Sequence, residues 1–242
     1  MKKIPSDTEF LEELLLPARR ARMASVLAQR TESLTLLLEN VKNPHNLSAI
    51  FRSADAFGLA EVHMIGADFE HMPKVSLGSE RWLRVTQHHD VEAALKYLES
   101  RQYELVVTAA PLSPVPESST NAARIQVIPI SELPFERRLV IAFGNEHKGV
   151  SESLLERAKY RAFIPMYGFV ESFNVSVACA ITLYASTLSD AVCKRRTAPL
   201  SNEYSDGLYE EWLRRSVKNA DGILANKEQA FKEQGIGVKG KE

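Results

Sequence analysis

Short apolar runs alternate along most of the chain with longer segments in which apolar residues recur every three or four positions. The apolar runs predict six strands, at residues 34–38, 61–65, 82–85, 105–108, 139–143 and 163–164. The segments with helical spacing predict helices at residues 43–58, 90–101, 151–159 and from residue 174 onward. Because strands that alternate with helices form right-handed βαβ units, the pattern predicts an α/β fold, with a mostly parallel sheet and helices on both faces.

The helix that begins near Asn174 has two apolar faces and is expected to pack on more than one side. One face carries large side chains, namely Val177, Ile181, Tyr184 and Leu188. The other carries smaller ones, namely Val175, Ala178 and Thr182. Three polar residues lie between the preceding strand and this helix: Glu171, Ser172 and Asn174. An α/β protein usually keeps its chemistry in such a loop, although Asn174 taken by itself is most simply a helix N-cap.

The two ends of the chain are predicted to be helical extensions of the core. Residues 8–30 have one apolar side and a group of arginines that includes Arg19, Arg22 and Arg30. These arginines could form either a solvated helix face or an RNA contact. Residues 203–234 predict one or two further helices, anchored by Leu208, Trp212 and Leu213. We therefore expect an N-terminal extension at 1–32, a core domain at 33–196 and a C-terminal extension with a tail at 197–242.

Composition narrows the classes of protein that fit. With 242 residues and 45% hydrophobic content, the chain suits one domain with appendages and a full core. The net charge of −1 gives no overall basic field, so a nucleic-acid site would have to be a local patch. The two cysteines, Cys179 and Cys193, lie too far apart on one predicted helix to form a disulfide. Without an apolar leader or an apolar run of bilayer length, we expect a reduced, cytoplasmic protein with no membrane segment.

Two further stretches carry candidate functional residues. In residues 39–58 the apolar helix face is formed by Leu47, Ile50, Ala54 and Phe57. Arg52 points almost opposite to this face, where a surface pair with Asp55 is the simplest interpretation. In residues 139–152 an apolar strand runs into a loop bracketed by Gly144 and Gly149, with Glu146 inside it. Glycines there let backbone amides approach a ligand closely, but the residue order is not that of a phosphate-binding P-loop.

Other motifs lack the context that their chemistry needs. Residues 235–240 match the glycine pattern of dinucleotide sites, but no predicted strand precedes them and no helix follows. The six histidines lack metal-ligand spacing, and the adjacent His88 and His89 would point to opposite sides of a strand. A nucleophile elbow is also missing from the sequence. The sequence therefore predicts neither a metal site nor a dinucleotide site.

Three segments, NPHNLSAIFRSADAFG, FGNEHKG and IPMYGFVESFNVSVA, resemble in this order the three motifs of the SPOUT superfamily of S-adenosylmethionine-dependent RNA methyltransferases. Within the superfamily they resemble the TrmH-type ribose 2′-O-methyltransferases, above all those that modify guanosine-18 of tRNA. The resemblance extends over most of residues 15–215. The chain departs from it at Glu171, where Gln is usual, at Phe173, where Leu is usual, and at residues 186–190, where the tRNA enzymes tend to carry Arg.

The resemblance implies a C-terminal trefoil knot and S-adenosyl-L-methionine as the cofactor. The implied cofactor-binding positions are Thr108, Gly144, Ile164 and Phe173. The implied catalytic positions are Asn46, Arg52, Glu146, Ser172 and Asn174. The resemblance also implies RNA contacts by Arg19, Arg22 and Arg30, no metal, and a homodimer in which Arg52 of one subunit completes the site of the other.

The reaction implied by the resemblance is methylation of the ribose 2′-hydroxyl of guanosine-18 in the D loop of tRNA. Because an arginine is effectively always protonated, we expect Arg52 to donate to the oxygen as it becomes negative rather than to act as a base. Two alternatives stay open: the same chemistry on ribosomal RNA or another tRNA position, and a non-catalytic RNA-binding protein of the same fold. The second predicts erosion of the polar residues, yet the five catalytic positions are all occupied as in the family.

Overall fold

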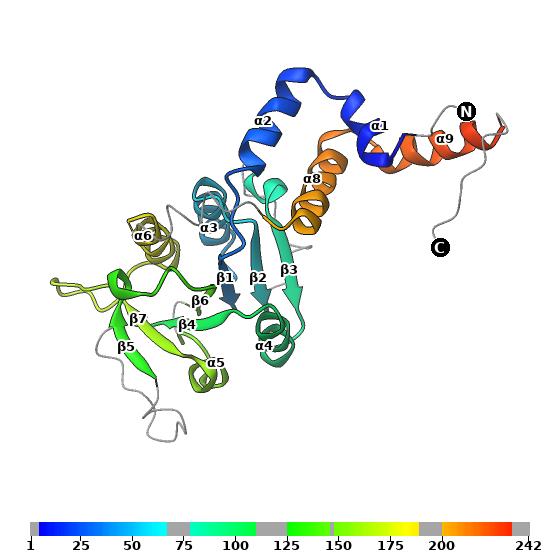
Figure 1. Cartoon of the computed structure of the whole chain (residues 1–242). Helices are drawn as coiled ribbons and strands as arrows, with labels where there is room; N and C mark the ends of the chain where they lie inside the picture. The colour runs from blue at the N-terminus through cyan, green and yellow to red at the C-terminus, as the bar shows by residue number, and fades with distance from the viewer. Residues whose placement is uncertain (1–4, 67–77, 110–124, 146–147, 189–199, 234–242) are drawn as a thin grey trace. The chain divides into compact units, whose positions relative to one another are not determined.

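A computed structural model describes residues 5–66, 78–109, 125–145, 148–188 and 200–233 (Figure 1). The chain divides into two units. Gln29–Pro199 form the larger unit, and Met1–Ala28 together with Leu200–Glu242 form the smaller one. The two terminal extensions, which are far apart in the sequence, therefore belong to one unit.

Seven parallel strands form the sheet of the larger unit, in the order β3-β2-β1-β6-β4-β7-β5. Their bounds are Leu34–Glu39 (β1), Glu61–Ile65 (β2), Arg84–His88 (β3), Glu104–Thr108 (β4), Gln126–Pro129 (β5), Leu139–Phe143 (β6) and Tyr160–Phe163 (β7). All six strand pairings are parallel, which confirms the predicted α/β class. The carboxyl ends of β6, β4 and β7 consequently lie side by side at one end of the sheet.

Three strands differ from the prediction, and polar or exposed residues explain the differences. The sequence does not predict β5, because this edge strand lacks an apolar run and its Val127 is 49% exposed. β7 starts earlier than predicted and includes Arg161, a buried charged residue that interrupts the apolar pattern. β3 starts later than predicted, because Trp82 belongs to a short 3₁₀ helix, Ser79–Trp82.

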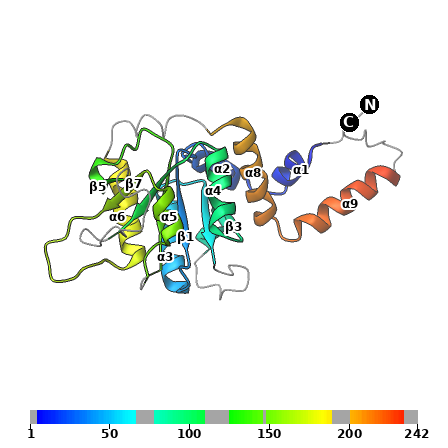
Figure 2. The same cartoon turned by 90° about the horizontal axis from the view of Figure 1, so that it is seen from below.

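Helices cover both faces of this sheet, as the sequence predicts (Figures 1 and 2). α3 (Pro44–Ala56) and α6 (Val175–Thr187) pack on one face. α4 (Val91–Ser100) and α5 (Glu152–Arg157) pack on the other. Within β1, Leu36 and Leu38 belong to the first core cluster and Leu37 to the second. Because both faces are covered, a central strand such as β6 is a continuous apolar run, and all five of its residues are buried.

Each of these four helices begins at a residue whose side chain accepts a hydrogen bond from the first helical turn. The N-caps of α3, α4, α5 and α6 are Asn43, Asp90, Ser151 and Asn174. Such a side chain pairs with an amide that has no partner inside the helix and typically contributes about 1 kcal/mol. The N-cap interpretation of Asn174 is therefore confirmed.

α6 packs closely against the chain through its face of small side chains and only in part through its face of large ones. Its buried positions are Val175, Cys179, Thr182, Leu183 and Ser186. Of the four large side chains, Ile181 packs against the core, whereas Val177, Tyr184 and Leu188 are 44%, 56% and 67% exposed. The predicted packing of the second face is therefore only partial in a single chain. An apolar face left open in this way is available to another molecule.

Four helices make up the described part of the smaller unit: α1 (Asp7–Glu13), α2 (Pro17–Leu27), α8 (Asn202–Ser216) and α9 (Ala220–Glu233). The sequence predicts a single helix at 8–30, but Pro17 starts a new one because it restricts the preceding Leu16 to extended backbone. The predicted anchors Leu208, Trp212 and Leu213 are buried. Tyr209 donates to the Glu12 carboxylate (2.7 Å) and Lys227 to the Asp7 carboxylate (3.1 Å), which joins the two ends of the chain.

Candidate active site

A cavity of about 680 Å³ lies at the carboxyl ends of β4, β6 and β7. Thr108 ends β4, Gly144 follows β6 and Ile164 follows β7, and all three line the cavity. The adjacency of these strands in a parallel sheet brings the three positions together. Phe173, the fourth predicted cofactor position, lines the same cavity from the loop before α6. The structure therefore gathers all four predicted positions around one space.

The walls of the cavity are mixed in character. An apolar part is formed by Ile130, Phe143, Val175 and Ala178. Three charged side chains also line it, namely Lys148, Arg161 and Glu171. Arg161 is 4% exposed, and burial lowers the pKa of its guanidinium from the ordinary value. Arg161 is not among the predicted site residues, although a lone charged residue inside the apolar run of a strand is a signal that could have identified it.

The loop after β6 closes on itself beside the cavity. Asn145 N–H donates to Gly149 O (3.0 Å), and Gly149 N–H donates back to Asn145 O (2.8 Å). Gly149 has φ of +68°, a conformation that L side chains rarely adopt. At Gly144 an added Cβ would lie 2.0 Å from the carbonyl oxygen of Gly149. Both glycines are therefore required by geometry. The predicted catalytic residue Glu146 belongs to this loop but lies outside the described residues.

The amino ends of α3 and α6 meet through two of the predicted catalytic residues. Asn174 Nδ2 donates to Asn46 Oδ1 (3.1 Å). The other end of the Asn174 amide, Oδ1, accepts from the N–H of Ser176 (2.9 Å) and from its Oγ (2.6 Å). The amide of Asn174 is thus fixed at both ends. Ser172 and Asn174 both line the cavity, so these two polar side chains lie at its border.

Arg52 is exposed on α3 and does not line the cavity of its own chain. The predicted surface pair with Asp55 is wrong, because the carboxylate of Asp55 pairs with Arg30 instead. Arg52 and Asn46 are six residues apart, which places them about 9 Å apart along the helix axis. Within one chain, Arg52 therefore does not join Ser172 and Asn174, the two predicted catalytic residues that line the cavity.

Of the three predicted RNA-contacting arginines, two are at the surface and one is interior. Arg19 and Arg22 are exposed on α2. Arg30 is 1% exposed and donates to the carboxylate of Asp55, to Asp55 O (3.2 Å) and to Leu59 O (2.8 Å). A guanidinium enclosed in this way holds the C-terminal turn of α3 and is not accessible to an RNA phosphate. We therefore do not keep the RNA contact for Arg30.

The described residues offer neither a metal site nor a membrane-spanning helix. In the described ranges, no group of three or more His, Cys, Asp or Glu side chains could hold a metal ion. No helix in those ranges is long and apolar enough to cross a membrane. Cys193 and residues 235–240 lie outside the described residues, while Cys179 is buried and free.

Comparisons with known proteins agree with the three motifs. The model of the SpoU rRNA Methylase family matches residues 33–184. The tRNA (guanosine(18)-2′-O)-methyltransferase of Thermus thermophilus is 34% identical over 201 residues, which cover 82% of this chain and 97% of that protein. Among solved structures, the A. aeolicus TrmH/SpoU tRNA modifying enzyme has a TM-score of 0.70 at 29% identity, covering 87% of this chain and 100% of that one.

A second solved structure bears on the cavity. The SpoU methyltransferase AviRb from Streptomyces viridochromogenes, in complex with the cofactor AdoMet, has a TM-score of 0.56 at 25% identity, covering 69% of this chain and 59% of that one. The family resemblance inferred from the sequence is confirmed by these matches. The chain belongs to the SpoU rRNA methylase family.

Proposed function

We propose that the protein transfers a methyl group from S-adenosyl-L-methionine to the ribose 2′-hydroxyl of guanosine-18 in the D loop of tRNA. The observation that carries the proposal is the cavity at the carboxyl ends of β4, β6 and β7, which is lined by Asn174, the hydrogen-bond partner of Asn46. The substrate follows from the 34% identity, over most of both chains, to a tRNA (guanosine(18)-2′-O)-methyltransferase. The structure of AviRb with AdoMet supports the choice of cofactor.

The cavity has the size and lining that the cofactor needs. Its volume of about 680 Å³ lies within the range of about 300–1,000 Å³ found for small-molecule sites. The apolar side chains beside Phe143 suit an adenine ring, and the close backbone approach at Gly144 and Gly149 suits recognition by main-chain groups. When bound, the cofactor supplies a methyl group on a positively charged sulfur. Glu171, a carboxylate among the lining residues, favours such a cation.

The residues of the chain have to orient the ribose and stabilise charge on its oxygen. The amide of Asn174, fixed by Ser176 and Asn46, is suited to hold a hydroxyl in one orientation. Ser172 adds a hydroxyl to the same border of the cavity. Arg52 stays protonated, so its role is to donate to the developing alkoxide while the proton leaves to solvent or to an RNA phosphate. Glu146 is assigned to the loop Gly144–Gly149, as an orienting carboxylate.

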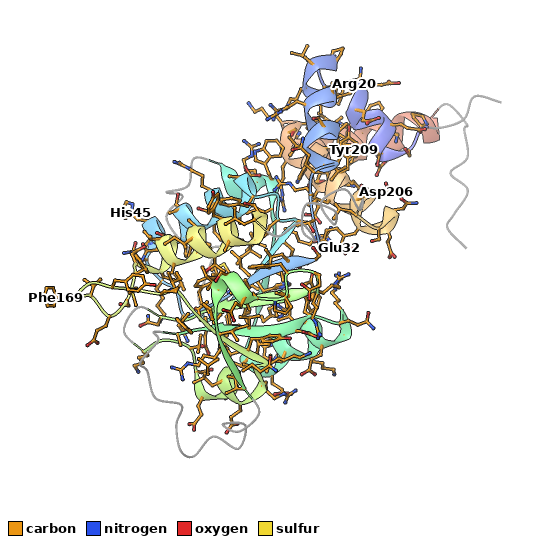
Figure 3. The ribbon with its side chains drawn as sticks, turned by 60° about the vertical axis from the view of Figure 1, so that its left-hand side comes forward. Arg20, Glu32, His45, Phe169, Asp206 and Tyr209 are labelled. Carbon is orange, nitrogen blue, oxygen red and sulfur yellow. The ribbon has the colours of Figure 1, made fainter. Side chains whose placement is uncertain are left out.

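The active form proposed is a homodimer. Arg52 does not line the cavity of its own chain, so a second subunit has to bring it there. The open face of α6 offers an apolar surface for that subunit, with Leu188 67% exposed. Phe169 is fully exposed on the loop before α6 and points away from the sheet (Figure 3), which extends the same kind of surface. A trefoil knot built from the loops that follow β6 and β7 belongs to this proposal, since both loops border the cavity.

Recognition of tRNA is assigned to the N-terminal extension, residues 1–32. Arg19 and Arg22 are exposed on one helix, α2, and provide the local positive charge that the net charge of −1 lacks. Phosphate contacts by such side chains give affinity and register rather than sequence specificity. Modification of tRNA at this position would take place in the cytoplasm.

Methyl transfer from labelled S-adenosyl-L-methionine to unmodified tRNA transcripts tests the proposal. Transcripts with guanosine, or with adenosine, at position 18 are compared, and the labelled nucleotide is mapped. Wild-type protein should label only the first, at the 2′-oxygen of residue 18, and Arg52→Ala should label neither. Label elsewhere in tRNA, or on ribosomal RNA alone, would replace the substrate but keep the chemistry. Cofactor binding with no transfer to any RNA would favour the non-catalytic alternative.

A further inference from the structure

Residues at the end of strand β1 form hydrogen bonds with Asn145 and Ser151, in the loop after β6, and do not themselves line the cavity. Glu39, the last residue of β1, accepts a hydrogen bond through Oε2 from the N–H of Ser151 (2.7 Å). The carbonyl oxygen of the next residue, Asn40, accepts one from Asn145 Nδ2 (3.2 Å). Glu39 at the end of β1 and Asn40 directly after it therefore hold Asn145 and Ser151, on either side of the loop glycine Gly149.

Glu39 is a buried carboxylate outside the cavity lining. It is 4% exposed and contacts the loop through the backbone of Ser151, the N-cap of α5. A buried carboxylate is costly unless it is hydrogen-bonded, and a bond from an N–H to an ionised acceptor is stronger than one between neutral groups. These effects favour one position of the loop relative to the sheet.

The backbone of Asn40 provides the second tie. Its φ of +54° is left-handed, which turns the chain sharply after β1. The carbonyl oxygen then accepts from Asn145, the residue whose backbone closes the loop with Gly149. Asn145 thus forms hydrogen bonds both within the loop, to Gly149, and to the chain at the end of β1, through Asn40.

We propose that Glu39 is a positioning residue for the cofactor, because its carboxylate holds the backbone of Ser151, which directly follows the cavity-lining residues Lys148–Val150. The loop residues that line the cavity are Gly144, Asn145, Lys148, Gly149 and Val150. This inference rests on the proposed function in one respect, since it takes the cavity to be the site of S-adenosyl-L-methionine. Removing the acceptor releases the C-terminal end of the loop and leaves the Ser151 N–H without its partner.

Binding of S-adenosyl-L-methionine to the full-length protein, measured by isothermal titration calorimetry without RNA, tests this role. Glu39→Met fills the same volume without an acceptor and should raise the Kd about tenfold or more, as expected for a buried donor left unpaired. Glu39→Gln keeps an oxygen acceptor and should stay within about threefold of the wild type. In methyl transfer, the KM for the cofactor should rise in Glu39→Met while the KM for tRNA does not change.

The chain offers a matched control in Glu61. This carboxylate is also 4% exposed and lies on the neighbouring strand β2, where it accepts from Thr86 (2.5 Å) and Tyr97 (3.3 Å) without lining the cavity. Glu61→Met removes a comparable buried carboxylate and should leave the cofactor Kd unchanged. Thermal unfolding of each variant establishes that it is folded, and Glu39→Ala replaces Glu39→Met if the latter is not.

The outcomes separate this inference from the proposed function. An unchanged Kd in Glu39→Met, or an equal loss in Glu61→Met, would overturn the positioning role. A wild-type protein that binds the cofactor but methylates no RNA would overturn the proposed function and leave the role of Glu39 in place. A wild-type protein that does not bind the cofactor would overturn both.

Discussion

Acid is expected to destabilise the protein through His63, a histidine on β2 that is 0% exposed. Its Nδ1 lies 3.1 Å from Nε2 of His88 on β3 and 3.8 Å from Oε1 of Glu61. The ring of Tyr97 on α4 lies 5.3 Å from it between centroids, and the guanidinium of Arg101 lies over that ring. Burial lowers the pKa of His63 from 6.5 to about 4; Glu61 opposes this change, and His88 and Arg101 add to it.

The sign and size of the effect follow from the two pKa values. Above pH 6.5 His63 is neutral in both the folded and the unfolded chain, and its contribution to stability is fully present. As the pH falls from 6.5 toward 4, the unfolded chain binds a proton that the folded chain does not bind, so stability is lost. At about 1.4 kcal/mol per pKa unit, the free energy of unfolding should fall by about 2 kcal/mol between pH 7.5 and pH 5 through this residue. The pKa of His88 is also lowered by burial, so its contribution has the same sign.

Urea unfolding at a series of pH values measures this slope. The glutamine in His63→Gln cannot take up the proton. In this variant the free energy of unfolding should therefore fall by about 2 kcal/mol less between pH 7.5 and pH 5 than it does in the wild type. His89→Gln is the control, because the neighbouring His89 has a side chain that is 80% exposed, and it should keep the wild-type slope. A His63→Gln variant with the wild-type pH dependence would refute the assignment of acid sensitivity to the buried histidine.

Three further predictions concern the proposed site. Arg52→Ala should lower kcat about 10²–10³-fold, as for the loss of one donor to a developing oxyanion, while the cofactor Kd measured by calorimetry stays unchanged; a rise in Kd would place Arg52 in cofactor binding. Gly144→Ala should abolish cofactor binding, because the new Cβ would lie 2.0 Å from Gly149 O, and unaltered binding in calorimetry would contradict the loop geometry. Arg19→Ala and Arg22→Ala should each weaken tRNA binding and reduce the slope of log Kd against log salt by about 1. Filter binding at several salt concentrations measures both quantities, and an unchanged slope would argue against phosphate contacts.

The sequence predicts the centre of the sheet better than its borders. β2 and β6 have the predicted bounds and β1 extends only one residue further, because strands covered on both faces are rich in apolar residues even where a polar residue such as His63 is buried among them. The edge strand β5 is not predicted, since an edge strand with an exposed Val127 has little apolar pattern. The break between α1 and α2 could have been predicted from Pro17, which the helical periodicity of residues 8–30 hides.

The family resemblance identified the cavity residues, whereas nothing in the sequence indicated the position of Arg52 and Arg30 relative to the site. The sequence predicts that Thr108, Gly144 and Ile164 end or follow strands, but the neighbouring order of β6, β4 and β7, which brings the three together, is seen only in the structure. Helical spacing places Arg52 opposite the buried face of α3, but it cannot say what that exposed side chain faces. Burial of an arginine depends on a distant acceptor, and the contact of Arg30 with Asp55 joins segments that no local pattern relates. The place of Arg52 outside the cavity of its own chain is thus the observation on which the proposed two-chain site depends.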